Sequence, residues 1–116
     1  MTDQTSRIAQ LNDLCRAGRD PTARIVITAT CLAALAGGAH SLAEIAAQAE
    51  VLAAVRHYAF RPEDGAERSR GAFEIRRQEV RFVIDYYDAS LEWGSENPAD
   101  PVVTTRVLTI MLPQDD

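Results

Sequence analysis

The chain contains no lysine, and all twelve of its basic residues are arginine. A GC-rich genome favours arginine codons, and this bias is the simplest explanation. Arginine also differs in function from lysine, because its planar guanidinium can bind a carboxylate through two hydrogen bonds. Gly37-Gly38 is not followed by the Lys and Ser or Thr of a phosphate-binding loop, so this pair predicts a turn and not a nucleotide site.

Long apolar runs are also absent. The most apolar segment, residues 41–59, is interrupted by charged and polar side chains, and no charged start leads into a hydrophobic stretch. We therefore expect neither a membrane span nor a secretory signal peptide, and we expect a cytoplasmic protein. Only two cysteines are present, Cys15 and Cys31, without the spacing of a metal site. We predict that both are small buried apolar side chains.

Histidine is equally scarce. Neither His40 nor His57 stands near a Cys, Ser or acidic residue in the pattern of a catalytic triad or a metal site. The basic residues are not interleaved with aromatic ones, which disfavours binding of nucleic acid. We therefore predict no cofactor, no metal ion, and no direct contact with nucleic acid or a membrane.

The 116 residues predict one domain, residues 1–116, with a single core, because 47% hydrophobic and 25% charged residues are typical of a globular chain. Charge is distributed unevenly. Residues 82–116 hold seven acidic side chains against Arg106 alone, a net charge of −6, whereas the whole chain has a net charge of −5. Such a surface repels nucleic acid and attracts basic partners.

The first half of the chain predicts two helices and a strand. Ile8, Leu11, Leu14 and Cys15 share a face of a helix over residues 5–17, and the β-branched residues 24–30 predict a strand. Ser41-Leu42-Ala43-Glu44 matches a capping box, which predicts a second helix over residues 42–58. In that helix the stripe expected to pack on a sheet is Leu42, Ile45, Ala49, Leu52 and Val55 or Arg56.

The second half predicts a hairpin after an exposed loop over residues 61–70. Residues 72–76 and 80–88 alternate in polarity and predict two strands joined near Arg77-Gln78, and Leu91-Glu92-Trp93 predicts a short third strand. Asp100 followed by Pro101 is typical of a helix start, so we expect a helix through Met111, with a strand as the alternative because the segment is β-branched. The fold class expected is α+β: a small antiparallel sheet, a hairpin or meander plus one N-terminal strand, packed against two to three helices.

The acidic residues near the aromatic ones are the candidates for a site. Asp85, Asp88 and Glu92 could supply an acid–base pair or bind a divalent cation. Alternatively, Asp88 caps a turn and Asp85 pairs with an arginine on a neighbouring strand, and this reading is favoured because cation sites need more oxygen ligands. Trp93 lies either at the edge of the core or at the centre of an interface, where tryptophan is enriched.

Three blocks of the sequence resemble a bacterial domain family of unknown function. They are Ile84-Asp85-Tyr86-Tyr87-Asp88, Pro98-Ala99-Asp100-Pro101, and Thr105-Arg106-Val107-Leu108-Thr109-Ile110-Met111-Leu112. The resembled family carries a Gly-Glu-His-Asp-Phe-Gly-like motif before the hairpin, where this chain reads Ala66-Glu67-Arg68-Ser69-Arg70-Gly71. The His and Asp are absent, which counts against metal or acid–base chemistry. Members occur on plasmids, phages and integrative elements, and the resemblance therefore implies an accessory role.

Together these patterns predict a non-enzymatic protein-binding module that is a monomer or a homodimer. Its partner would be a basic protein surface. The occurrence of the resembled family on mobile elements implies that this partner is a host nuclease or a CRISPR effector subunit, and that the protein is an anti-CRISPR or anti-restriction inhibitor. The alternative is a small metal-dependent or acid–base enzyme that uses Asp85, Asp88 and Glu92. The residues expected to bind the partner are Asp85, Tyr87, Asp88, Glu92, Trp93, Glu96 and Asp100.

Overall fold

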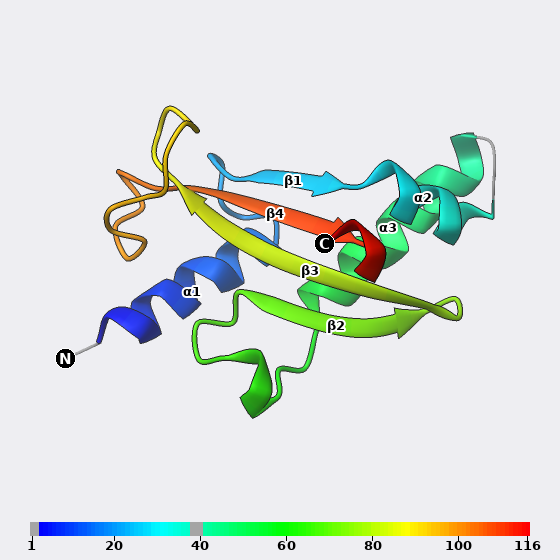
Figure 1. Ribbon diagram of the computed structural model, residues 1–116, viewed down its shortest axis with the longest axis horizontal. Coiled ribbons are helices and arrows are strands. Elements are labelled where there is room, and N and C mark those ends of the chain that lie inside the picture. Colours follow the sequence, from blue (N-terminus) through cyan, green and yellow to red (C-terminus); the bar gives the residue numbers. More distant parts are fainter. Residues whose placement is uncertain (1–2, 38–40) are drawn as a thin grey trace.

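The computed structural model describes residues 3–37 and 41–116, which form one four-stranded sheet with helices packed on one of its faces (Figure 1). The helices are α1 (Gln4–Arg16), α2 (Ala29–Ala36) and α3 (Ser41–Arg56). The strands are β1 (Arg24–Ile27), β2 (Arg70–Ile75), β3 (Gln78–Tyr87) and β4 (Thr105–Met111). The expected α+β class is confirmed.

Helix α1 lies where the sequence predicts it. Asp3 caps its N-terminus by accepting a hydrogen bond from the Ser6 amide, as expected for an acidic residue at this position. Ile8, Leu11 and Cys15 are buried, whereas Leu14 is 43% exposed. The apolar face is therefore narrower than the sequence suggests.

Strand β1 ends three residues earlier than predicted, and the helix α2 that follows was not predicted. The hydroxyl of Thr28 accepts a hydrogen bond from the Cys31 amide and so caps α2. Gly37, with a φ of 70°, ends the helix in the left-handed conformation. Thr28 and Thr30 looked like strand residues because they are β-branched, but Thr28 acts here as a helix cap.

Helix α3 is confirmed, but its predicted packed face is correct only in the second half, where Val55 is buried and Leu52 packs against the core. Ala47, Val51 and Val55 are buried against the sheet, whereas Leu42 is 74% exposed and Ile45 is 64% exposed. Both faces of this helix are rich in Ala, Leu and Ile, so periodicity cannot decide which one packs. The expected capping box depends on the side chain of Ser41, and His40 precedes it; both lie outside the described part of the chain.

Strands β2 and β3 form the expected hairpin, with Ile75 opposite Gln78. Its two turn residues, Arg76 and Arg77, have φ values of 51° and 66°, the sign that a type I′ turn requires at both central positions. Residues 91–93 do not form the expected strand. In that region the only pairing is an isolated bridge between Tyr87 and Gly94.

The prediction of a helix after Pro101 is wrong, because residues 105–111 form strand β4. The Asp100 carboxylate accepts a hydrogen bond from the Val102 amide, which makes a turn and not a helix cap. Arg106, Leu108 and Ile110 are buried, and the residues between them are more exposed. This period of two is the strand signal that the Asp-Pro pair obscured.

The strand order is β1-β4-β3-β2, with β1 parallel to β4 and the other pairs antiparallel. The sheet is therefore mixed and not purely antiparallel as expected. Phe82, Ile84, Leu108 and Ile110 face the helices and form the core with residues of α2 and α3. The predicted burial of Cys15 and Cys31 is confirmed, and both are free thiols. No helix among the described residues is long and apolar enough to span a bilayer.

Candidate protein-binding surface

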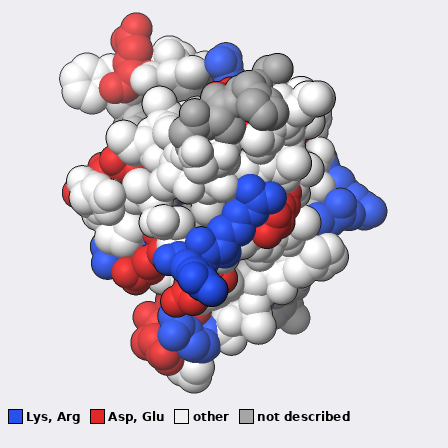
Figure 2. Space-filling model, turned by 90° about the vertical axis from the view of Figure 1, so that its right-hand side faces the viewer, with Lys and Arg blue, Asp and Glu red and all other residues white. Residues whose placement is uncertain are grey.

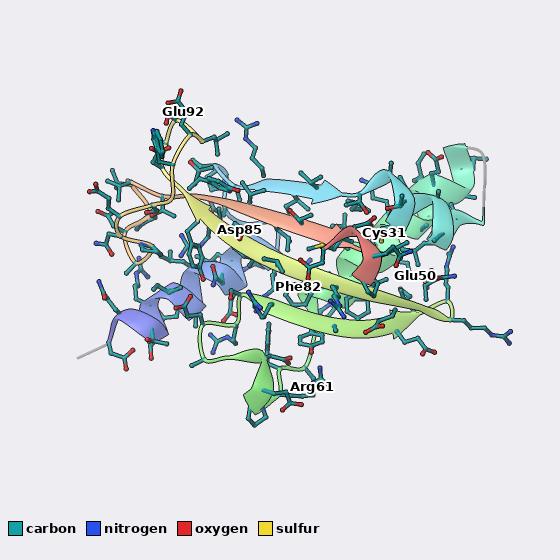
Figure 3. The ribbon with its side chains drawn as sticks, in the orientation of Figure 1. Cys31, Glu50, Arg61, Phe82, Asp85 and Glu92 are labelled. Carbon is teal, nitrogen blue, oxygen red and sulfur yellow. The ribbon has the colours of Figure 1, made fainter. Side chains whose placement is uncertain are left out.

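The loop between β3 and β4, residues 88–104, concentrates the negative charge of the chain. Its acidic side chains are Asp88, Glu92, Glu96 and Asp100, and it contains no arginine, so its net charge is −4. Figure 3 shows Glu92 at the tip of this loop, beyond the end of the sheet. The opposite end of the molecule, with the β2–β3 hairpin, carries basic and acidic side chains side by side (Figure 2).

Large apolar side chains are also exposed on the β3–β4 loop. Trp93 is 72% exposed, Val102 is 85% exposed, and Leu91 is 38% exposed. A single exposed apolar residue is common, but a tryptophan within an acidic loop combines the anchor and the charged rim of a protein interface. Of the two readings of Trp93, exposure favours the interface reading over the edge of the core.

The first half of the loop is held by Asp88. Its Oδ1 atom accepts hydrogen bonds from the Ser90 hydroxyl at 2.7 Å and from the Glu92 amide at 3.2 Å. The Asp88 amide donates to the Trp93 carbonyl at 2.8 Å. The hydrogen bonds from Ser90 and the amides lower the pKa of Asp88, which remains charged in its turn. The prediction that Asp88 caps a turn is confirmed.

The second half of the loop is held by two hydroxyl groups. Ser95 Oγ and Thr104 Oγ1 lie 2.7 Å apart, and the Thr104 hydroxyl donates to the Asn97 carbonyl at 2.8 Å. The Ser95 amide donates to the Tyr86 carbonyl at 3.0 Å, which ties the loop to the end of β3. A loop held by its own hydrogen bonds loses little conformational entropy when a partner binds.

Arg106 anchors the loop from inside the domain. This residue is 1% exposed; its Nη2 donates to the Pro98 carbonyl at 2.6 Å and its Nε to Asn12 Oδ1 at 2.7 Å. The guanidinium also lies 5.1 Å from the centre of the Tyr86 ring. No ion pair with a carboxylate is formed among the described residues. Burial therefore lowers the pKa of Arg106.

Beside the loop, the face of the sheet opposite the helices bears a shallow apolar groove. Tyr87, Leu91 and Val107 line it together with Val26 of β1. Asp85 projects from the same face of β3, opposite Val107 in the strand register. The expected ion pair of Asp85 with an arginine is not found among the described residues.

The seven predicted site residues thus divide into two groups. Asp85 and Tyr87 lie on the open face of β3, and the remaining five lie in the β3–β4 loop: Asp88, Glu92, Trp93, Glu96 and Asp100. Within the described residues, no group of three or more His, Cys, Asp or Glu side chains could hold a metal ion. Asp85, Asp88 and Glu92 are therefore not grouped as ligands of a cation among the described residues.

The segment 66–71, where the resembled family carries its His and Asp, has structural contacts here. Arg68 donates to both carboxylate oxygens of Asp13, at 2.9 and 2.6 Å. Burial alone would raise the pKa of Asp13, but the hydrogen bond and the charge of Arg68 lower it. Glu67 Oε1 accepts from the Tyr86 hydroxyl at 2.7 Å, and burial raises the pKa of Tyr86 to about 12.

Sequence reasoning missed the residues that hold and surround the acidic loop. Arg106 and Asn12 are buried polar residues that fix it from inside, and Leu91 and Val102 add exposed apolar side chains to the same loop as Trp93. Arg106 alternates with Leu108 and Ile110, so reading residues 105–111 as a strand would have placed it in the core. No pattern in the sequence identifies Asn12, because it occupies a helix position next to apolar residues.

The chain belongs to a family described as protein of unknown function (DUF3768), whose model matches residues 30–115. The match covers most of the chain, including the β3–β4 loop and the three strands β2, β3 and β4. No curated protein and no solved structure matches the chain.

Proposed function

We propose that this member of the DUF3768 family is a non-enzymatic protein-binding module that presents its β3–β4 loop to a basic surface of another protein. The observation that carries the proposal is the exposure of Trp93, 72%, in a loop that has four acidic residues, no arginine and a dense set of its own hydrogen bonds. Trp93 would fill a pocket of the partner, and the acidic side chains would surround it.

Charge supports the nature of the partner. An acidic loop attracts a basic surface during the diffusional encounter and raises the association rate, and salt screens this attraction. Surfaces that bind nucleic acid are rich in Arg and Lys, since they neutralise phosphates. We therefore propose, more specifically, that the protein is an anti-CRISPR or anti-restriction inhibitor. It would act in the cytoplasm and cover the nucleic-acid-binding surface of a nuclease complex.

A tagged pull-down from host lysate, at low and at high salt, tests this function. The proposal expects capture of a nucleic-acid-binding protein at low salt and its loss at high salt. The test variant carries Glu92→Arg and Glu96→Arg, two exposed residues of the loop whose side chains make no hydrogen bond among the described residues. Asp88 is left unchanged because it holds the turn.

A matched control carries Glu74→Arg and Glu79→Arg. These residues are exposed and pair in the hairpin at the other end of the sheet, so the change in net charge is the same. We expect the loop variant and Trp93→Ala to weaken the captured complex at least about tenfold, and the control to leave it unchanged. Equal loss in both charge variants would refute the placement of the site, and failure to capture any macromolecule would refute the function.

A further inference from the structure

Strand β1 forms an open edge of the sheet. In the strand order β1-β4-β3-β2 it pairs on one side only, and Figure 1 shows it along the upper border of the sheet. Ile25 is 41% exposed and Val26 is 47% exposed. Sheet edges are usually protected by Pro, Lys, a bulge or a covering segment, because an unprotected edge pairs with another strand. Residues 24–27 contain no Pro and no Lys, and their register with β4 has no bulge. The strand is short, with four residues and one charged side chain, Arg24, but the exposed Ile25 and Val26 are apolar.

The backbone groups that this edge leaves free can be identified from the register. The Thr28 amide donates to the Ile110 carbonyl of β4. In a parallel pair, both backbone groups of every second residue point to the same neighbouring strand. The N–H and C=O of Arg24, Val26 and Thr28 therefore point to β4, and those of Ile25 and Ile27 point away from the sheet.

We propose that two copies of this chain pair through β1, antiparallel and about a two-fold axis at Val26, to form one continuous eight-stranded sheet. In this register Ile25 lies opposite Ile27 of the second copy, and Ile27 opposite Ile25. Each pair exchanges two backbone hydrogen bonds, as a hydrogen-bonded antiparallel pair does. The free groups of β1 thus complement themselves, which an isologous dimer requires.

Side chains on both faces of the paired strands favour a second copy of this chain as the partner that binds the β1 edge. On the open face, the two Val26 side chains meet at the axis. On the helix face, Ile25 and Ile27 line a groove with Leu32 and Leu52, and the same isoleucines of the second copy would cover it. Apolar and β-branched side chains paired across strands stabilise a sheet.

Charges at the two ends of β1 are complementary under the same symmetry. Arg24 lies opposite Thr28 of the second copy in the proposed register. The Thr28 hydroxyl donates to Asp115 Oδ2 at 2.9 Å, so a carboxylate lies at that end of the strand. Arg24 itself makes no ion pair among the described residues. The dimer would therefore contain two equivalent Arg24–Asp115 pairs.

Sedimentation equilibrium of the full chain, together with amide hydrogen exchange, tests the proposal. We expect a species of twice the 12.7 kDa protomer mass as the concentration rises towards about 1 mM. The amides of Ile25 and Ile27 should become protected with concentration, whereas the Val26 amide, bonded to β4, should be protected throughout.

Val26→Lys places two positive charges at the axis and should raise the dimer dissociation constant at least about tenfold. Val83→Lys is the control, because Val83 lies on the same open face of the sheet but in β3, which β4 separates from β1. If circular dichroism shows that the Val26→Lys variant is unfolded, Arg24→Glu replaces it, and it too should raise the dimer dissociation constant. A monomer at all concentrations would overturn the proposal, and so would a dimer unaffected by these variants, which would place self-association elsewhere, for example on exposed Leu42 and Ile45 of α3.

Discussion

Replacing Arg106 with Met should destabilise the domain and loosen the β3–β4 loop. The Pro98 carbonyl and Asn12 Oδ1 each lose a charged donor, at 2.6 and 2.7 Å. A buried polar group left without a partner costs about 1–3 kcal/mol. Methionine has similar length and fills the space with a flexible chain, so the cavity formed is small.

One effect opposes this loss. Arg106 is buried without a carboxylate beside it, and removal of a buried charge relieves its desolvation penalty. The loss of the donor to buried Asn12, of the donor to the half-buried Pro98 carbonyl and of the contact with the Tyr86 ring outweighs that relief, and we expect a net loss of about 2–3 kcal/mol in the free energy of unfolding. In urea, followed by far-ultraviolet circular dichroism, the midpoint should fall by roughly 1–2 M.

Arg81→Met is the matched control. Arg81 lies on the open face of β3, its side chain is 41% exposed, and its ion pair with Asp116 is 3.5 Å long. An exposed pair of this kind contributes less than about 1 kcal/mol. The Arg106 variant should also speed amide exchange of Ser95 and Asp100, whose amides make loop hydrogen bonds. A midpoint equal to that of the control, or unchanged exchange at these two amides, would refute the anchoring role of Arg106.

Gly71→Ala should cost about 1–3 kcal/mol, because a Cβ atom there would lie 2.6 Å from the Tyr58 ring and 2.7 Å from the Phe82 ring. Gly94→Ala is the control, with its nearest neighbour at 3.8 Å, and equal thermal midpoints for the two variants would contradict this account. The pKa of Tyr86 is about 12 in the folded state and 10 in the unfolded chain. The protonated phenol therefore stabilises the fold fully below pH 10, and this stabilisation is lost as the pH rises towards 12. The loss amounts to at most about 2.7 kcal/mol, so urea midpoints of wild type should fall more steeply above pH 10 than those of Tyr86→Phe; parallel curves would argue against it.

Much of the fold could be predicted from local patterns. The hairpin follows from strict alternation in residues 80–87, where one set of side chains is apolar and the other is mixed, and α1 follows from its apolar spacing. The errors arose where a local signal had two meanings. Asp100-Pro101 is compatible with a helix cap and with a turn, and Thr28 is compatible with a strand and with a helix cap.

The candidate site was predicted in part for the same reason. Charge and aromatic content are properties of composition, so the sequence located the acidic segment and Trp93 directly. The support beneath the loop was not visible, because Asn12 and Arg106 are 94 residues apart in the sequence and meet only when α1 packs against β4. The long separation leaves no periodic signal that could link them.

The sequence by itself determined the class of the protein, the acidity of its C-terminal third, the hairpin, and the position of a tryptophan among acidic residues. These depend on composition and on spacing between near neighbours. Only the tertiary structure decided which face of α3 packs, that residues 105–111 pair as a strand between β1 and β3, and that β1 lies at an open edge. Those outcomes depend on which of several apolar surfaces bury each other best, and this competition involves the whole chain.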